Sequence, residues 1–492
     1  MESISVVLCR FHSYRKLLTN LSLWKFYRNN HQLAAATDEA RHPGKLSTLF
    51  VPGRYGANMY QIVKPVININ EIVQNINAIQ HSFRSRGISF DIENSIDLLR
   101  QFEAERDSYL KFVEKDHEYL TELSNLKSLN DESKYSNLQR EHDTFIIELK
   151  AAKEKFNHIE ELFLSIIAKL PNIIHPCTPL QSDTIEEYIT PKEINRTMWS
   201  HVEIGKNMSF FKHSKNSSVS YYLTGILSDL ELAIQTYFYN KFIENGVTPI
   251  ACVDFCKSFL LEAVGLDPYS PDQCISLKLK AERGQKLHLV GGASFESFCA
   301  YLTNMNVSKH TFPMKYFSLG RCYNAKHRHE KSFDLFSIVQ SSNFHYLTLC
   351  KDSKNEDEEF ESFFNLLISC YSDFKIPFRA INCSAKNLNT TESRRKLLEM
   401  WSPAEQMYKP VAHVSQRGDF VSKRLHVTYG VEHVIEGYCH MVEGVAVNIP
   451  VLMAFIVENF QKSNVFAIFS GSYKVFPSFY HCPVKLTNPY MQ

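Results

Sequence analysis

The feature that most constrains the fold of this chain is a seam of apolar residues that recurs at alternating steps of four and three. The seam consists of Leu138, His142, Phe145, Leu149, Ala152, Phe156, Ile159, Phe163, Ile166 and Leu170. Lys, Glu and Gln occupy the intervening positions. This spacing places one apolar stripe along a long α-helix, which needs a second helix to cover it.

A weaker seam precedes it, from about residue 96. Its members are Leu99, Phe102, Arg106, Tyr109, Val113, Leu120, Leu123 and Leu126. Polar residues between Asn130 and Ser136 separate the two seams and can cap or turn the chain. We therefore expect residues 60–172 to form an antiparallel coiled-coil hairpin. At ~1.5 Å per residue, each helix is long enough to form an arm rather than a packed layer.

After this arm the pattern changes. Three prolines, Pro171, Pro176 and Pro179, end the helix and start an extended segment. The segments that follow predict helices over Ser228–Asn245 and Val445–Gln461, and strands over Lys286–Val290 and Val465–Phe469. This mixture predicts that residues 173–492 form an α+β domain, in which helices flank a largely antiparallel sheet.

The N-terminal segment has a different composition. Its basic residues, interleaved with apolar ones, are Arg10, Arg15, Lys16, Lys25 and Arg28. Glu2 is the only acidic residue before Asp38. A basic, acid-poor, amphipathic N-terminus is typical of a mitochondrial transit peptide. We expect residues 1–50 to be a transit peptide and linker for the mitochondrial matrix; a basic surface helix is the alternative.

The composition limits the remaining classes of function. The formal net charge is +1 and the pI is about 7.6, so any RNA binding must come from a local patch. The 12 cysteines include no Cys-x-x-Cys pair. We expect reduced, mostly buried thiols rather than a metal site. No cofactor is expected, and no apolar run is long enough for a membrane.

Several ordered segments resemble the seryl-tRNA synthetase family of class II aminoacyl-tRNA synthetases. These segments are Leu-Pro-Asn-Ile-Ile-His-Pro at 170–176, Leu-Glu-Leu-Ala at 230–233, Gly-Val-Thr-Pro at 246–249, residues 444–461 and Asn-Pro-Tyr-Met at 488–491. Residues 444–461 are similar to the third class-defining motif. The likeness runs from about Tyr60 to the C-terminus. It implies a helical tRNA arm followed by a class II catalytic-core fold.

The same resemblance indicates that the residues for ATP activation are lost. Adenylate formation needs cations on the triphosphate. The family's phosphate-binding arginine falls on Asn324, and the carboxylate of that motif falls on Lys326. A second family arginine falls on Ser337, and the arginine of the third motif falls on Val451.

Serine recognition is altered as well. The family's Thr-x-Glu loop, which holds the substrate ammonium, falls on Gly292 and Ser294. Two further family glutamates fall on His345 and Pro410. The resemblance therefore implies a degenerate paralogue without catalytic residues, which does not activate serine. Misalignment of the motif blocks is the alternative.

The retained parts suggest binding. The candidate RNA-binding residues of the arm are Arg100, Arg106, Lys111, Lys115, Arg140, Lys150, Lys153 and Lys155. A solvated helical face is the equal alternative for them. The family dimerises through its catalytic domain, and the candidate interface residues here are Leu230, Leu232, Ala233, Tyr237 and Pro249.

Three functions remain open. The first is a non-catalytic partner that dimerises with an active mitochondrial seryl-tRNA synthetase and supports tRNA-Ser binding and aminoacylation. The second is a homodimeric regulator of mitochondrial gene expression that binds RNA or protein. The third is an enzyme with an altered substrate.

Overall fold

A computed structural model describes residues 48–49, 74–88, 92–129, 132–167, 170–190, 198–213, 221–279, 285–329, 334–431 and 434–461. Chain contacts divide the protein into Met1–Leu46 and Ser47–Gln492, and the described residues belong to the second unit. The expected transit peptide and linker lie outside the described residues, except for 48–49. The expected strand Val465–Phe469 also lies outside them.

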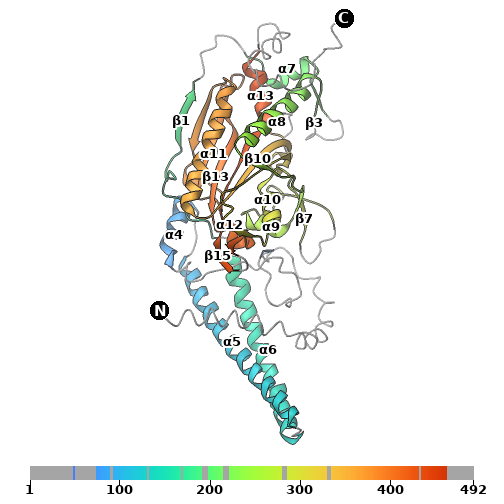
Figure 1. Ribbon diagram of the computed structural model, residues 1–492, viewed down its shortest axis with the longest axis vertical. Coiled ribbons are helices and arrows are strands. Elements are labelled where there is room, and N and C mark those ends of the chain that lie inside the picture. Colours follow the sequence, from blue (N-terminus) through green and yellow to red (C-terminus); the bar gives the residue numbers. More distant parts are fainter. Residues whose placement is uncertain are drawn as a thin grey trace. The chain divides into compact units, whose positions relative to one another are not determined.

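The two long helices are present. Helices α4 (Ile76–Ser85), α5 (Ile92–Ser128) and α6 (Glu132–Ile167) open the described chain, and α5 and α6 pack side by side (Figure 1). The ring pairs between α5 and α6 are Phe102–Phe163 at 4.4 Å, Tyr109–Phe156 at 5.4 Å and Phe112–Phe145 at 5.8 Å. The predicted helical hairpin is confirmed.

The register of the weaker seam was partly wrong. Phe112, Asp116 and Tyr119 contact α6, whereas the predicted Leu120 is 37 % exposed. Asp116 Oδ1 lies 2.7 Å from His142 Nε2. An acidic side chain therefore occupies one seam position, and this polar pair interrupts the apolar pattern on which the prediction depended.

One eight-stranded sheet forms the centre of the second half. Its spatial order is β1 (Thr184–Ile189), β11 (Phe378–Asn382), β12 (Arg394–Ser402), β13 (Met407–Gly418), β16 (His440–Asn448), β10 (Gln340–Cys350), β9 (Met314–Tyr323) and β4 (Thr248–Pro249). Neighbouring strands are antiparallel except β4 and β9. The predicted α+β class, with a largely antiparallel sheet, is confirmed.

Small sheets and short helices complete the described fold. The small sheets are β2 (Phe211–His213) with β3 (Tyr221–Leu223), β5 (Phe255–Lys257) with β7 (Leu287–Leu289) and β6 (Ile275–Ser276), and β15 (Val434–Tyr438) with β14 (Thr428–Val431) and β8 (Asn306–Ser308). The helices are α7 (His201–Asn207), α8 (Ile226–Glu244), α9 (Ser258–Ala263), α10 (Phe295–Leu302), α11 (Ser353–Asp373), α12 (Phe420–Leu425) and α13 (Ile449–Asn459), with 3-10 turns η2 (Ala325–His329) and η3 (Ala385–Asn387).

The two faces of the sheet cover separate cores, because side chains alternate along each strand. On β10, Phe344 and Tyr346 join the first core, which also contains residues of α8, α11 and α13. Leu347 and Leu349 join the second core, with residues of α9, α10 and α12. His345 has the same parity as this second pair, so it lies on the second-core face.

The helix predicted from Val445 begins later. Val445 pairs with His345 in the sheet, and α13 starts only at Ile449. The Asn448 side chain caps the helix by accepting from the Val451 N–H, and Pro450 occupies its first turn. An apolar strand that runs directly into an apolar helix shows no change in hydrophobicity at the boundary, which explains the error. The predicted helix over Ser228–Asn245 is confirmed as α8.

Candidate functional site

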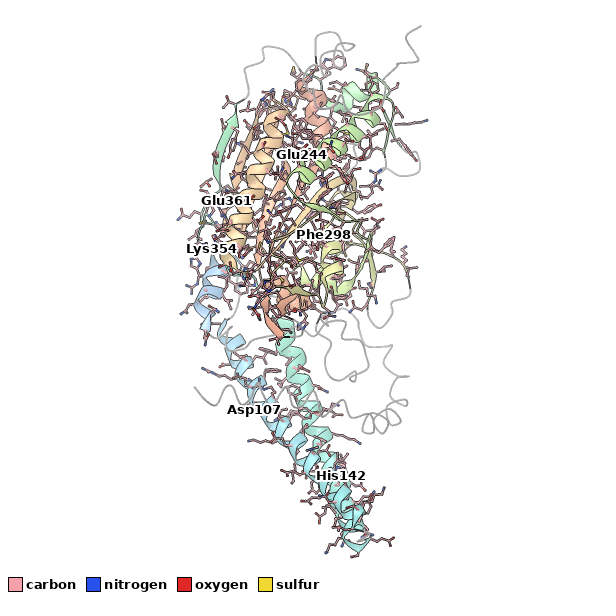
Figure 2. The ribbon with its side chains drawn as sticks, in the orientation of Figure 1. Asp107, His142, Glu244, Phe298, Lys354 and Glu361 are labelled. Carbon is pink, nitrogen blue, oxygen red and sulfur yellow. The ribbon has the colours of Figure 1, made fainter. Side chains whose placement is uncertain are left out.

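The positions that the resemblance assigns to serine recognition come together where α10 packs on the second-core face of the sheet. His345 of β10 is buried, and its ring lies 5.6 Å from the Phe298 ring of α10, which Figure 2 labels. The Phe295 ring is stacked at 6.5 Å. Gly292 and Ser294 directly precede α10. One small region therefore holds three of the predicted positions.

Gly292 belongs to a loop that is bonded tightly to its neighbours. Its N–H donates to Asp254 Oδ1 at 2.8 Å, and its carbonyl accepts from the Ser318 hydroxyl at 2.8 Å. A Cβ added at Gly292 would lie 2.8 Å from the Cys252 carbonyl oxygen. The preceding Gly291 has φ +92, and a Cβ there would lie 2.1 Å from the Arg321 carbonyl. This backbone has no room for a threonine at 292.

The buried Ser294 side chain caps α10. Its hydroxyl accepts from the Ser297 N–H as the N-cap of α10 and donates to the Gly291 carbonyl at 2.8 Å. Both hydrogen-bonding roles of this buried hydroxyl are therefore used within the protein.

A buried ion pair lies beside His345. Arg417 of β13 donates through Nη2 at 2.6 Å and through Nε at 3.1 Å to Glu443 Oε1 of β16. The other carboxylate oxygen, Oε2, lies 3.0 Å from His345 Nε2. Burial alone would raise the pKa of the Glu443 carboxyl, but Arg417 and His345 lower this pKa far below its usual range.

A second carboxylate faces the same guanidinium. Glu392 Oε1 lies 3.6 Å from Arg417 Nη2 and accepts from the Ser415 hydroxyl at 2.9 Å. Burial raises the pKa of Glu392, but Arg395 and Arg417 outweigh burial, so the net shift is downward. Burial likewise lowers the pKa of Arg417, but Glu443 and Glu392 raise it overall. The cluster therefore remains charged although it is buried.

The positions assigned to ATP lie around the turn between β9 and β10. Asn324 is exposed, and its Oδ1 accepts from the Lys326 N–H at 3.1 Å. Lys326 is exposed in η2. Ser337 donates its N–H to the Asp334 carbonyl at 3.2 Å in the turn before β10. Both of these hydrogen bonds are local turn contacts.

Two further positions lie elsewhere. Val451 is buried in the first turn of α13 and belongs to the first core. Pro410 is exposed near the start of β13, opposite Glu399, whereas Arg417 is at the other end of that strand. The structure therefore does not bring Pro410 to the cluster around His345.

Arg321 of β9 is close to these positions in the chain, but it is already paired. Its Nη1 donates to the Ser342 hydroxyl at 2.6 Å and lies 3.7 Å from Glu231 Oε1 of α8. Ser342 in turn donates to Glu231. This group ties α8 to the sheet.

The basic candidates of the arm fall into two groups. Arg100 pairs with Asp97 at 3.2 Å, Arg106 with Asp107 at 3.1 Å, and Lys155 with Glu105 at 2.6 Å. Lys115 lies over the Phe145 and Tyr119 rings. Within the described part of the arm, the remaining candidates carry no ion pair, and these are Lys111, Arg140, Lys150 and Lys153.

The interface candidates are also divided. Tyr237 is buried within the chain itself, and its hydroxyl donates to Asp373 at 2.7 Å. Leu230 packs partly against the first core, and Ala233 is half-buried. Leu232 and Pro249 are exposed. Sequence reasoning did not single out Tyr239 and Ile243, which are exposed on α8.

Sequence reasoning also missed the central residue of the cluster. Arg417 is the only Lys, Arg, Asp or Glu between Pro410 and Gly418, and this was the only signal for it. Among the described residues, no group of three His, Cys, Asp or Glu could hold a metal ion. No helix in the described ranges combines the length and apolarity needed to cross a bilayer.

Sequence comparison with known proteins identifies a matching domain and several relatives. Residues 280–460 match the tRNA synthetase class II core domain (G, H, P, S and T). The chain is 26% identical to the serine–tRNA synthetase-like protein Slimp of Drosophila melanogaster, over 77% of this chain and 82% of that protein. It is 24% identical to the mitochondrial serine–tRNA ligase of Saccharomyces cerevisiae, over 81% of this chain and 91% of the relative.

Solved structures share the fold. The cytoplasmic serine–tRNA ligase of Naegleria fowleri, solved with AMP, has a TM-score of 0.68 at 18% identity, over 84% of this chain and 97% of that one. Seryl-tRNA synthetase of Pyrococcus horikoshii, solved with ATP, has a TM-score of 0.65 at 15% identity, over 81% and 95%. The expected resemblance to seryl-tRNA synthetases is confirmed, and the match to a class II tRNA synthetase core covers residues 280–460.

Proposed function

We propose that this chain, which carries a class II tRNA synthetase core, is a non-catalytic paralogue of seryl-tRNA synthetase. It dimerises with an active mitochondrial seryl-tRNA synthetase and supports tRNA-Ser binding and aminoacylation by that partner. Similarity to Slimp and to mitochondrial serine–tRNA ligases supports a mitochondrial protein. The matrix is the compartment that contains such a partner.

The observation that carries the proposal is that no unpaired arginine is found at the described positions where the resemblance expects triphosphate-binding arginines. The positions assigned to triphosphate-binding arginines hold Asn324, Ser337 and Val451. The arginines of β9 and β13, Arg321 and Arg417, both pair with carboxylates of the chain itself. Removing one group that stabilises charge in a transition state costs about 10²–10³ in rate. Loss of several such groups leaves no efficient adenylate chemistry.

An apolar stripe on α8 supports a partner subunit. Leu232, Tyr239 and Ile243 are 47%, 41% and 43% exposed. Steps of seven and four place them on one side of the helix. The adjoining β4 is an edge strand of the large sheet, and its Pro249 is exposed. An exposed apolar face beside an open sheet edge is the kind of surface that a second subunit covers.

The arm supports a contribution to RNA binding. Lys111, Arg140, Lys150 and Lys153 have no ion pair among the described residues, so their charges are available to phosphates. Lys150 and Lys153 are three residues apart and therefore neighbours on the surface of α6.

Serine-dependent ATP–pyrophosphate exchange tests the catalytic part of the proposal. The purified chain should give no signal above a blank, while the mitochondrial seryl-tRNA synthetase gives a full signal under the same conditions. Adding the chain to a limiting amount of that enzyme should raise tRNA-Ser aminoacylation. Exchange by the chain alone would refute the proposal. No effect on the partner enzyme, together with a stable homodimer, would favour a homodimeric regulator instead.

A further inference from the structure

Arg417 is a buried cation held on several sides. Its guanidinium donates to Glu443 through Nε and Nη2 and to the Thr391 hydroxyl through Nη1. Glu392 Oε1 lies 3.6 Å from Nη2. The side chain of Arg417 is 6% exposed, and those of the two glutamates are 1% exposed. Its partners therefore replace water around the planar fork of donors.

An aromatic ring closes another side of this pocket. The Arg417 guanidinium carbon lies 4.6 Å from the centre of the Phe295 ring, the first residue of α10. The negative face of a ring attracts a cation, most strongly where water is excluded. Two carboxylates, one hydroxyl and one ring face thus surround a single guanidinium.

The backbone at Arg417 holds the side chain in place. The N–H groups of Arg417 and Gly418 both donate to Glu356 Oε1, at 3.1 and 2.8 Å. Glu356 Oε2 lies 2.8 Å from His440 Nδ1. The register between β13 and β16 shifts between Gln416 and Gly418. This irregularity, which the buried Glu356 carboxylate stabilises, sets the direction in which the Arg417 side chain projects from β13.

The walls of the pocket come from separate parts of the chain. Glu443 belongs to β16, Phe295 to α10, and Glu392 to the turn before β12. Ser294, which directly precedes Phe295, and His345, which contacts Glu443, are positions that the resemblance assigns to serine recognition. The guanidinium therefore lies directly beside the candidate substrate region.

We infer that Glu392, Glu443, Thr391 and Phe295 form a guanidinium-binding pocket, which the chain's own Arg417 fills permanently. The inference deepens the proposed non-catalytic function and rests on it in one respect, namely that the filled pocket belongs to the former substrate region. Together with Arg395, which lies 3.6 Å from Glu392, the tethered cation balances the charge of the two carboxylates and excludes a free amino acid. Removal of the side chain opens a site for small planar cations.

Thermal unfolding of the full chain tests this inference. Arg417→Ala should lower the melting temperature by several degrees, because the buried carboxylates of Glu443 and Glu392 lose the cation that they share. Millimolar guanidinium, far below denaturing concentrations, should then restore part of the loss. Sodium chloride and urea at the same concentrations should not. The wild-type chain should gain nothing from guanidinium or from serine, since its pocket is already filled.

A matched control is Arg379→Ala. Arg379 also makes two hydrogen bonds to one carboxylate, that of Glu399, but this pair joins β11 to β12 and is less buried. Guanidinium should not rescue this variant. Equal rescue of both variants, no rescue of Arg417→Ala, or stabilisation of the wild-type chain by serine would each overturn the inference.

A second measurement serves if Arg417→Ala fails to fold. In nitrogen-15 spectra of the wild-type chain, the Arg417 Nε proton should exchange with water far more slowly than that of Arg379, and Arg417→Lys identifies the signal. Equally fast exchange of the two would contradict a filled pocket. These readouts are independent of catalysis. Pyrophosphate exchange by the wild-type chain would reject the proposed function while leaving the rescue result interpretable.

Discussion

A guanidinium that is removed from water needs anionic partners, and Arg417 has two, Glu443 and Glu392. Truncating one member of such a buried group is costly, because the remaining charge stays buried without compensation. At the scale of single residues, the candidate site contains groups that satisfy one another. Ser294 caps α10, and Gly292 packs against the Cys252 carbonyl oxygen. Arg417 forms an ion pair with Glu443.

Returning an arginine to position 451 should destabilise the protein. Val451 is buried in the first core, a cluster of apolar side chains. We expect Val451→Arg to cost about 3 kcal/mol or more in the free energy of unfolding, because a charge would be buried without a partner. Denaturant unfolding measures the loss.

The matched control is Asn324→Arg, at an exposed position. We expect it to change stability by no more than about 0.5 kcal/mol. If Val451→Arg were as stable as Asn324→Arg, position 451 would still open to a cation-accepting cavity, contrary to its burial in the structure.

A histidine network at α7 predicts a pH dependence of stability. His201 Nδ1 lies 2.7 Å from Glu458 Oε1. Its Nε2 lies 3.0 Å from Asp334 Oδ1 and 3.1 Å from the Leu335 backbone nitrogen, so protonation of Nε2 exchanges the bond from Leu335 for one to Asp334. Burial lowers the pKa of His201, but Asp334 and Glu458 raise it overall, above 6.5. The contribution of the protonated ring is therefore fully present below the unfolded-state pKa of 6.5 and is lost as the pH rises through the higher folded-state pKa.

His201→Gln removes this contribution, so the difference in unfolding free energy between wild type and variant should be larger near pH 5.5 than near pH 8.5. Denaturant titrations of both proteins at the two pH values give this difference. At the lower pH we expect the variant to lose about 3–5 kcal/mol, because the Glu458 carboxylate stays buried without its cation. A difference that is equal at both pH values would contradict a protonated His201.

At the scale of elements, α6 was predictable because the contacts of Phe145, Phe156 and Phe163 with α5 follow one apolar period. The α5 seam was only partly predictable, since Asp116 occupies a position that pairs with His142 across the hairpin. The start of α13 depends on a single cap at Asn448. Arg417 could not be predicted as a pocket residue, because its partners come from distant segments of the chain.

The arm gives a prediction at this scale. Phe145 is buried between α5 and α6, where it meets Phe112 and Tyr119. We expect Phe145→Ala to cost the hairpin about 3–5 kcal/mol through lost burial and a cavity. Hydrogen exchange should then become faster along α5 and α6, while the β10 and β16 amides keep their protection.

Ile147→Ala is the control, because Ile147 lies on the same helix but is 68% exposed. Its exchange pattern should match that of the wild-type protein. Equal loss of protection in both variants would show that the seam does not determine the stability of the hairpin.

At the scale of the whole molecule, the chain combines a site that its own side chains fill with surfaces that are exposed to solvent. The α8 stripe is apolar and exposed, and several basic residues of the arm are unpaired within the described chain. The proposed function depends on these open surfaces, through contacts with a partner, rather than on chemistry of the chain's own. A homodimer would use the same α8 stripe. The composition of the native complex therefore distinguishes a homodimer from a heterodimer with the synthetase.

The α8 stripe predicts which substitutions break the complex. Leu232→Asp combined with Ile243→Asp should abolish association without unfolding the chain, since both side chains are exposed in the single subunit. Met407→Asp is the control, because Met407 is equally exposed but lies on β13. Size-exclusion chromatography with light scattering of each variant mixed with mitochondrial seryl-tRNA synthetase should show a heterodimer for the control and none for the double variant.

The mass of the native complex, purified from mitochondria of the cells that make this protein, tests the central claim most directly. Native mass spectrometry should show one copy of this chain with one copy of mitochondrial seryl-tRNA synthetase. A complex that contains only copies of this chain, or a monomer, would contradict the proposed partnership.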